Sequence, residues 1–117
     1  MLKTKRIYDP SAKKDGFRVL VDRLWPRGVS KDRAHLGVWM KEIAPSDVLR
    51  KSFAHNPAHW KEFVTKYRGE LKHKKELLQQ SKLLEAEHGT VTLLYAARDE
   101  EHNQAAVLCK FIESDFR

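Results

Sequence analysis

The stretch VTLLYAARDEEHNQAAVL, residues 91–108, decides the fold class of this chain. It opens with an apolar run that is typical of a strand covered on both faces. Acidic residues follow, and then small and aliphatic side chains at helical spacing, which predict a final helix. A strand followed by a helix in this way is characteristic of α/β proteins.

A second apolar run, FRVLV at residues 17–21, predicts another strand. Its last three residues are apolar on both faces, as in a central strand that is covered above and below. Pro26 and Gly28 then force a loop. We therefore expect residues 17–21 and 91–95 to be neighbouring central strands.

Two further strands are predicted, at residues 3–8 and 36–43. The pattern of the second also fits a helix, because apolar residues recur at helical as well as alternating positions. Gly37 disfavours a helix and Pro45 follows shortly, so we favour the strand.

Helices are expected between the strands. A short one begins near Ser46, and a long one begins at Asn56, with a proline in its first turn and an apolar stripe along its length. The helical pattern continues over residues 72–87 and stops at Gly89. Asp99 is expected to cap the final helix.

This order of elements predicts the architecture. Strands separated by helices need crossover connections and at least partly parallel pairing. A length of 117 residues suits one domain. We predict a single α/β domain over residues 1–117, with a small, at least partly parallel central sheet of about three to four strands packed by helices.

The composition points to anionic partners. Lys and Arg number 23 against 16 Asp and Glu, which gives a net charge of +7. This excess makes an anionic small molecule or a nucleic acid a candidate partner, and a solvated basic surface is the alternative. The amino terminus lacks a signal peptide and no apolar run is long enough for a membrane span, so we expect a cytoplasmic protein with no membrane partner. The oligomeric state is left open.

No cofactor and no metal are predicted. Cys109, the one cysteine, lies in an apolar helical stretch and is expected to be a core residue. His55 and His59 have the i, i+4 spacing of a metal pair, but Pro57 lies between them and no HExxH glutamate is present. A structural role is therefore favoured for these histidines.

Polar segments follow both central strands at the point where each strand ends. Residues 22–28, DRLWPRG, follow the first strand, and residues 98–103, RDEEHN, follow the second. Ligands of open α/β sheets bind beyond the carboxyl ends of the strands. We expect the two segments to meet there.

The residue types in these segments suit an anion site with acid–base groups. Arginine forks match phosphate or carboxylate, tryptophan offers a stacking face, and glycine lets a ligand approach the backbone. The predicted ligand-binding residues are Arg23, Trp25, Arg27, Gly28, Arg98 and Asn103, and the predicted catalytic residues are Asp22, Asp99 and His102. A purely architectural role is equally open, with Asp99 as a helix cap and Asp22 as an arginine partner.

Four stretches carry a family resemblance: VDRLWPRGVSK at 21–31, WMKEIAPSDVLRKSF at 39–53, HNPAHWKEFVTKYRGEL at 55–71 and VTLLYAARDEEHNQAAVL at 91–108. Through them the chain resembles the YeaO-like branch of a widespread bacterial family of domains of unknown function. The resemblance implies a small cytosolic α/β protein and adds Arg50 to the ligand-binding residues. Relatives often have cysteines in the segment equivalent to 96–106, where this chain has Ala96 and Ala97, so no thiol mechanism is carried over.

Three functions stay open at this point. The first is a protein, enzymatic or not, with an Arg-rich pocket for a phosphate- or carboxylate-bearing small molecule. The second is a nucleic-acid-binding module that uses the basic surface, including KHKK at 72–75. The third is a protein-interaction domain that uses the long helices.

Overall fold

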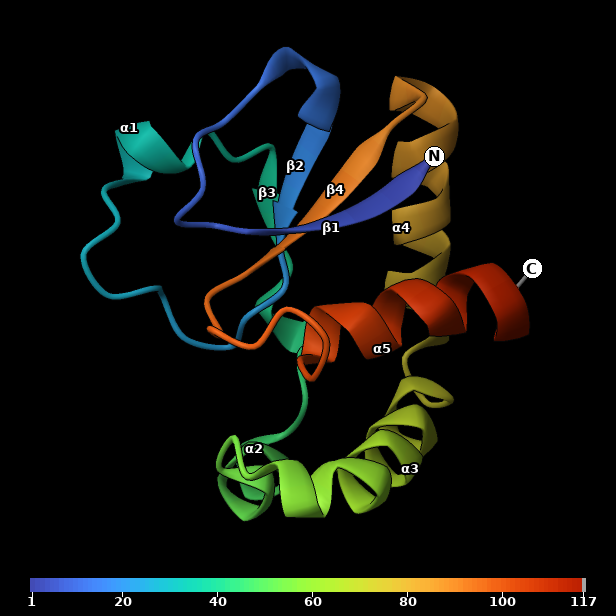
Figure 1. Ribbon diagram of the computed structural model, residues 1–117. Helices are drawn as coiled ribbons and strands as arrows, with labels where there is room; N and C mark the ends of the chain where they lie inside the picture. Colours follow the sequence, from blue (N-terminus) through green and yellow to red (C-terminus); the bar gives the residue numbers. More distant parts are fainter. Residues whose placement is uncertain (117) are drawn as a thin grey trace.

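The computed structural model describes residues 1–116, and its centre is a parallel sheet (Figure 1). The four strands are β1 (Leu2–Arg6), β2 (Phe17–Leu20), β3 (Val38–Trp39) and β4 (Val91–Tyr95), in the order β1-β4-β2-β3. All three neighbouring pairs are parallel. The α/β prediction is thus confirmed, and β2 and β4 are the neighbouring central strands that their apolar runs predicted.

Five α-helices surround the sheet: α1 (Lys31–Ala34), α2 (Asp47–Phe53), α3 (Trp60–Leu71), α4 (Lys75–His88) and α5 (Gln104–Lys110). Shorter helical turns occur at η1 (Lys13–Asp15), η2 (Lys41–Ile43), η3 (Pro57–His59) and η4 (Phe111–Asp115). Figure 1 shows α4 alongside the sheet and α2 with α3 beyond the end where β2 and β4 finish, with α5 crossing between them. No helix in residues 1–116 has the length and apolar character of a membrane span.

The two faces of the sheet are covered by different elements. Successive side chains of a strand point to opposite faces, so neighbouring residues belong to different clusters. Val19 pairs with Leu93, and both belong to the larger core under α3, α4 and α5. Leu20 pairs with Leu94, and both belong to a smaller cluster on the other face. That second face is covered by α1 and by irregular chain between residues 22 and 37.

A buried ion pair also lies on the second face. Arg18 donates to Asp15 at 2.6 Å and makes two further bonds to the Ala34 carbonyl, at 3.1 and 3.0 Å. Burial acts to raise the pKa of Asp15, but hydrogen bonds from Ala12, Lys5 and Arg18 hold it below its ordinary value. These bonds tie the loop before β2 to α1, and so they close the face that lacks a long helix.

Several element boundaries differ from the predictions. The strand expected at 36–43 is reduced to β3, because Lys41–Ile43 winds into a helical turn whose Met40 carbonyl accepts from the Ile43 amide at 3.2 Å. The helix expected from residue 72 begins at Lys75, so residues 72–74 form the turn between α3 and α4. Lys74 donates from this turn to the Ala44 carbonyl at 2.7 Å, which fixes where the chain reverses.

Candidate functional site

A pocket of about 280 Å³ opens at the carboxyl ends of β2 and β4. Its lining comes from three parts of the chain: the loop after β2, the segment from η2 through α2 to the start of α3, and the link from β4 into α5. Open α/β sheets place ligand sites at this edge, because polar groups at the strand ends are not used within the sheet.

Asp22 lies at the inner end of this pocket, directly after the buried Val21. Its Oδ2 accepts from the Ala96 amide at 3.0 Å, and its Oδ1 accepts from the Gln104 side-chain amide. Burial raises the pKa of Asp22 to about 6, although both hydrogen bonds oppose the shift. The carboxyl therefore joins the end of β2 to the end of β4 and to α5, and it titrates near neutral pH.

Arg23 lies in the pocket lining, but it already has protein partners. Its Nε donates to the Pro45 carbonyl at 3.0 Å and its Nη2 donates to the Ala44 carbonyl at 3.1 Å. A third nitrogen is 3.7 Å from Glu42. Arg23 thus holds the wall formed by residues 44–45 through Nε and Nη2, and its Nη1 makes an ion pair with Glu42 but no hydrogen bond with residues 1–116.

Arg50 has donor capacity to spare. It projects from α2, whose amino terminus is capped by Ser46, and its Nη2 is 3.2 Å from Asp47. Its Nε is buried and has no hydrogen-bond partner in residues 1–116. A buried donor without a partner is destabilising by about 1–3 kcal/mol, so a small movement of the Arg50 side chain that brings this nitrogen to a ligand oxygen would be favourable.

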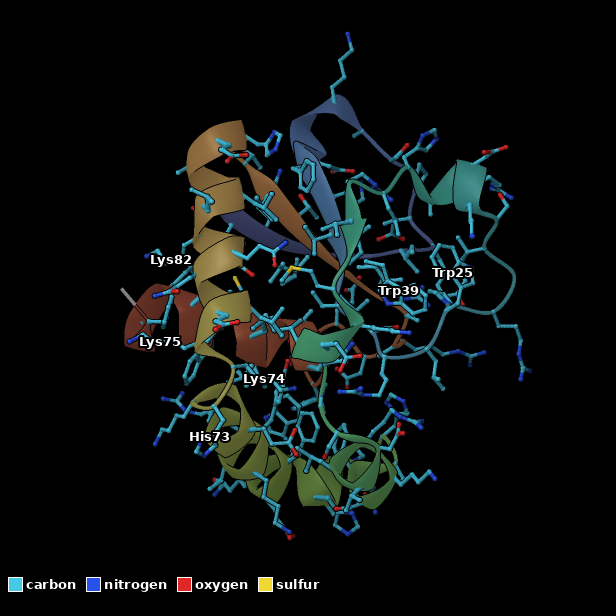
Figure 2. All side chains as sticks on the ribbon, turned by 180° about the vertical axis from the view of Figure 1, so that it is seen from behind. Trp25, Trp39, His73, Lys74, Lys75 and Lys82 are labelled. Carbon is cyan, nitrogen blue, oxygen red and sulfur yellow. The ribbon has the colours of Figure 1, made fainter. Side chains whose placement is uncertain are left out.

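Aromatic side chains form two walls of the pocket. Trp25 is fixed on one side by a 2.7 Å bond from its indole nitrogen to the Val29 carbonyl and by edge contact with Trp39, at 5.4 Å between ring centroids (Figure 2). Phe53 and Phe63 stack at 4.5 Å and form the wall contributed by α2 and α3. The pocket thus offers flat apolar surface on two sides.

His55 and Arg27 lie at the mouth of the pocket, and both are exposed. Ala54 and His55 both have left-handed backbone conformations, with φ of 48° and 56°, and this sharp turn after α2 places His55 beside the opening. The carbonyl of Arg27 accepts from the Tyr8 hydroxyl at 2.8 Å, while its guanidinium makes no ion pair or hydrogen bond with residues 1–116.

Asp99, His102 and Asn103 form a separate cluster outside the pocket lining. Asp99 accepts from the backbone amides of His102 and Glu101, both at 2.9 Å, and its other oxygen is 2.9 Å from His102 Nδ1. These bonds, led by that from the His102 amide, lower the pKa of Asp99 to about 2. This cluster fixes the turn that precedes α5.

The N-cap of the final helix therefore lies one turn later than predicted, at Asn103 and not at Asp99. Asn103, which is buried, is the N-cap of α5 and accepts from the Ala106 amide at 2.9 Å. Asp99 instead closes the turn before it, because its side chain reaches only the amides of residues 101 and 102. The His102 ring packs edge-on against Trp60, at 5.0 Å between centroids, so this histidine links the turn before α5 to α3.

Of the ten residues named from the sequence, Asp22, Arg23, Trp25, Arg27 and Arg50 line one pocket. Gly28, with a φ of 79°, lies on a different hollow between residues 7–11 and 28–35, and Arg98 is exposed outside both. Sequence reasoning missed Gln104, Phe53 and Phe63. For Gln104 the only signal is its place, one residue after the polar segment 98–103.

Metal-binding and thiol groups are not gathered at the pocket. Residues 1–116 contain no group of three or more His, Cys, Asp or Glu side chains placed to hold a metal ion. Cys109 is half-buried on α5, with its sulfur 3.8 Å from the Leu2 carbonyl, and burial raises its pKa to about 12. Its thiol is therefore protonated and poorly nucleophilic at neutral pH.

Comparison with known proteins places the chain among relatives of the same length. Residues 1–117 match the family model described as "Inactive DUF488-N3 subclade". The chain is 40% identical to "Uncharacterized protein YeaO" of Escherichia coli K12, over 97% of each chain. It is 37% identical to "Uncharacterized protein Rv3073c" of Mycobacterium tuberculosis H37Rv, over 95% of this chain and 92% of the relative. No solved structure matches the chain significantly.

Proposed function

Because this chain belongs to the inactive DUF488-N3 subclade, we propose that it binds a ligand without transforming it, and that the pocket beside Asp22 holds a small molecule bearing a phosphate or carboxylate group. The observation that carries this proposal is the unpartnered Nε of Arg50 at the pocket wall. An arginine donates from several nitrogens of one plane, so a planar or tetrahedral anion satisfies it well.

The surroundings of Arg50 support an anion. Arg27 and His55 add donors at the mouth, and the chain carries a net charge of +7, which raises the local concentration of anions. The residues that line the pocket within the described chain include no serine, cysteine or lysine to act as a nucleophile. For an enzymatic version of the proposal, the lining offers only Asp22 and His55 as proton carriers, and we therefore favour binding.

Calorimetric titration with pyrophosphate and with citrate at low ionic strength tests the proposal. Arg50→Gln removes the guanidinium and is expected to weaken binding of the better anion at least ten-fold. Lys51→Gln is the matched control, because Lys51 is exposed on the same helix, lies outside the pocket, and loses the same charge. Equal affinities for the two variants would show that the anions follow net charge and would reject the pocket.

A nucleic-acid surface is the second candidate, and the turn between α3 and α4 favours it. Figure 2 shows His73, Lys74 and Lys75 gathered at this turn, with Lys82 further along α4. Lys74 is half-buried and bonded to Ala44, which leaves its neighbours to contact phosphates. A gel shift at two salt concentrations tests this surface, because phosphate contacts give a steep salt dependence. Absence of binding at low salt would reject it.

A further inference from the structure

The inner end of the pocket restricts which anions fit. Asp22 is ionised above its pKa of about 6, so a ligand that is anionic throughout is repelled from this end. Of the groups that attract the anion, Arg27 and His55 are exposed at the mouth, and Arg50 is half-buried on α2. The ligand must therefore have two unlike ends, one that accepts from guanidinium groups and one that tolerates a carboxylate.

The groups at the inner end select hydrogen-bond donors. Each oxygen of Asp22 accepts one bond within the protein, and a carboxylate has about four acceptor positions, so both oxygens can accept again. Gln104 uses its amide nitrogen on Asp22, and its Oε1 accepts no hydrogen bond from residues 1–116. The inner end thus presents adjacent acceptors to whatever enters.

The walls between the two ends select a flat ring. Trp25 is held in one orientation by Val29 and Trp39, and the Phe53–Phe63 stack contributes further aromatic surface to the lining. A volume of about 280 Å³ lies at the small end of ligand pockets and takes one heterocycle with its sugar, but not a second base.

Resting on the proposed function, we infer that the ligand is a nucleotide whose base enters the pocket with an N–H edge toward Asp22 and Gln104 and whose phosphate lies toward Arg50 and Arg27. Guanine fits best, because its ring N–H and its exocyclic amino group lie side by side and suit a carboxylate. Uracil fits worst, because its single N–H lies between two carbonyl oxygens that the acceptors repel. Enclosing a base by stacking and reading its edge is how proteins bind bases outside a duplex.

Titration calorimetry with the four ribonucleoside monophosphates tests this inference, with ribose 5-phosphate as the baseline. We expect GMP to bind at least ten-fold more tightly than UMP and than ribose 5-phosphate. Asp22→Asn replaces an acceptor by a donor at the same size, and we expect it to abolish the preference for GMP. Asp32→Asn, on the exposed side of α1 and outside the pocket, makes the same charge change and should keep the preference.

A second variant covers the case in which Asp22→Asn does not fold. Gln104→Ala removes one acceptor and leaves the bond between Asp22 and Ala96 in place, and it should reduce the GMP-to-UMP ratio at least three-fold. An unchanged ratio in a folded variant would overturn the role assigned to this end of the pocket.

The base can come from a free nucleotide or from a single strand, and two oligonucleotides separate these sources. One is a thymine heptamer and the other carries a single central guanine. Binding of the guanine-containing strand that is tighter than that of both GMP and the thymine heptamer supports a base presented by a strand, and tighter binding of GMP than of the strand supports the free nucleotide.

The outcomes also separate this inference from the proposed function. If all nucleotides bind within two-fold of ribose 5-phosphate while Arg50→Gln still weakens them, the anion site stands and the base-reading inference is wrong. If no phosphate compound binds, both are wrong. Binding of free phenylalanine or tryptophan in place of nucleotides would overturn the inference as well.

Discussion

At the scale of single residues, the buried carboxylate of Asp22 lowers the free energy of unfolding at neutral pH. Its folded pKa of about 6 lies above the ordinary value of 3.8, so the folded state binds this proton more tightly than the unfolded state does. The free energy of unfolding therefore falls as the pH rises from about 4 to about 6. The difference corresponds to about 3 kcal/mol at most.

The first prediction follows from this fall in the free energy of unfolding with rising pH. Asp22→Asn removes the titration, so the variant should gain stability relative to the unaltered protein as the pH rises from 4 to 6, and the gap should stay constant above pH 7. Urea unfolding at intervals between pH 4 and pH 8 measures it. Curves that run parallel for the two proteins would contradict the burial of this carboxylate, and Asp32→Asn supplies the control for loss of one surface charge.

Single residues also show what sequence can reveal about the site. Asp22, Arg23, Trp25 and Arg27 were found because they follow an apolar strand within a few residues, and strand ends are the usual place for ligand sites. Gln104 reaches Asp22 from 82 positions along the chain. That meeting depends on how α5 packs across the sheet, and no local pattern encodes it.

At the scale of elements, the start of α5 determines whether Gln104 reaches the pocket. Asn103 caps this helix, and its side-chain nitrogen also donates to the Asp99 carbonyl at 2.9 Å. We predict that Asn103→Ala destabilises the protein by about 1–2 kcal/mol, because the Ala106 amide loses its partner and the turn loses a bond. Urea unfolding measures this loss.

Asn103→Ser is the matched control, since serine is a comparable N-cap and its hydroxyl accepts from the Ala106 amide without burying a charge. It should retain most of the stability that alanine loses. A loss as large in both variants would show that the cap bond contributes little and that the buried amide nitrogen is what the site requires.

The Asp99 turn makes a separate pH prediction at the same scale. The folded pKa of Asp99, about 2, lies below the ordinary value of 3.8, so its contribution is complete above about pH 4 and is lost as the pH falls toward 2. We expect Asp99→Ala to flatten the decline in stability over this range in urea unfolding. An equal decline in stability below pH 4 in the variant and the unaltered protein would contradict the capping role given to Asp99.

Elements differ in how well the sequence predicts them. β2 and β4 follow from apolar runs, and α3 follows from its apolar stripe, because these signals are local. The predicted start at Asn56-Pro57 belongs to the helical turn η3, and α3 itself begins at Trp60. The segment 36–43 was ambiguous for a physical reason: its residues are shared between a two-residue strand, a helical turn and the smaller apolar cluster. The break before α4 lies at residues 72–74, where Lys74 is fixed by a carbonyl 30 residues away, and this position could not be read from the local sequence.

At the scale of the whole molecule, the two apolar clusters share one sheet. Val19 and Leu20 face opposite sides of the same strand, so neither cluster can be lost without the other. We predict that the chain unfolds in one cooperative transition. Fluorescence of a Trp60→Phe variant reports on Trp25 and Trp39 in the smaller cluster, and circular dichroism reports mostly on the helices over the larger one. Transitions with different midpoints would contradict a single domain.

The irregular cover of the second face should also report whether a ligand occupies the pocket. Residues 22–37 hold Trp25 against the pocket, and the Asp22 carbonyl accepts from the Trp39 indole of β3, but this segment makes few backbone hydrogen bonds of its own. Their amides should exchange with deuterium far sooner than those of β4, through brief openings that leave the helical side intact. A molecule seated against Trp25 would oppose those openings, so its binding should slow the exchange of amides in residues 22–37.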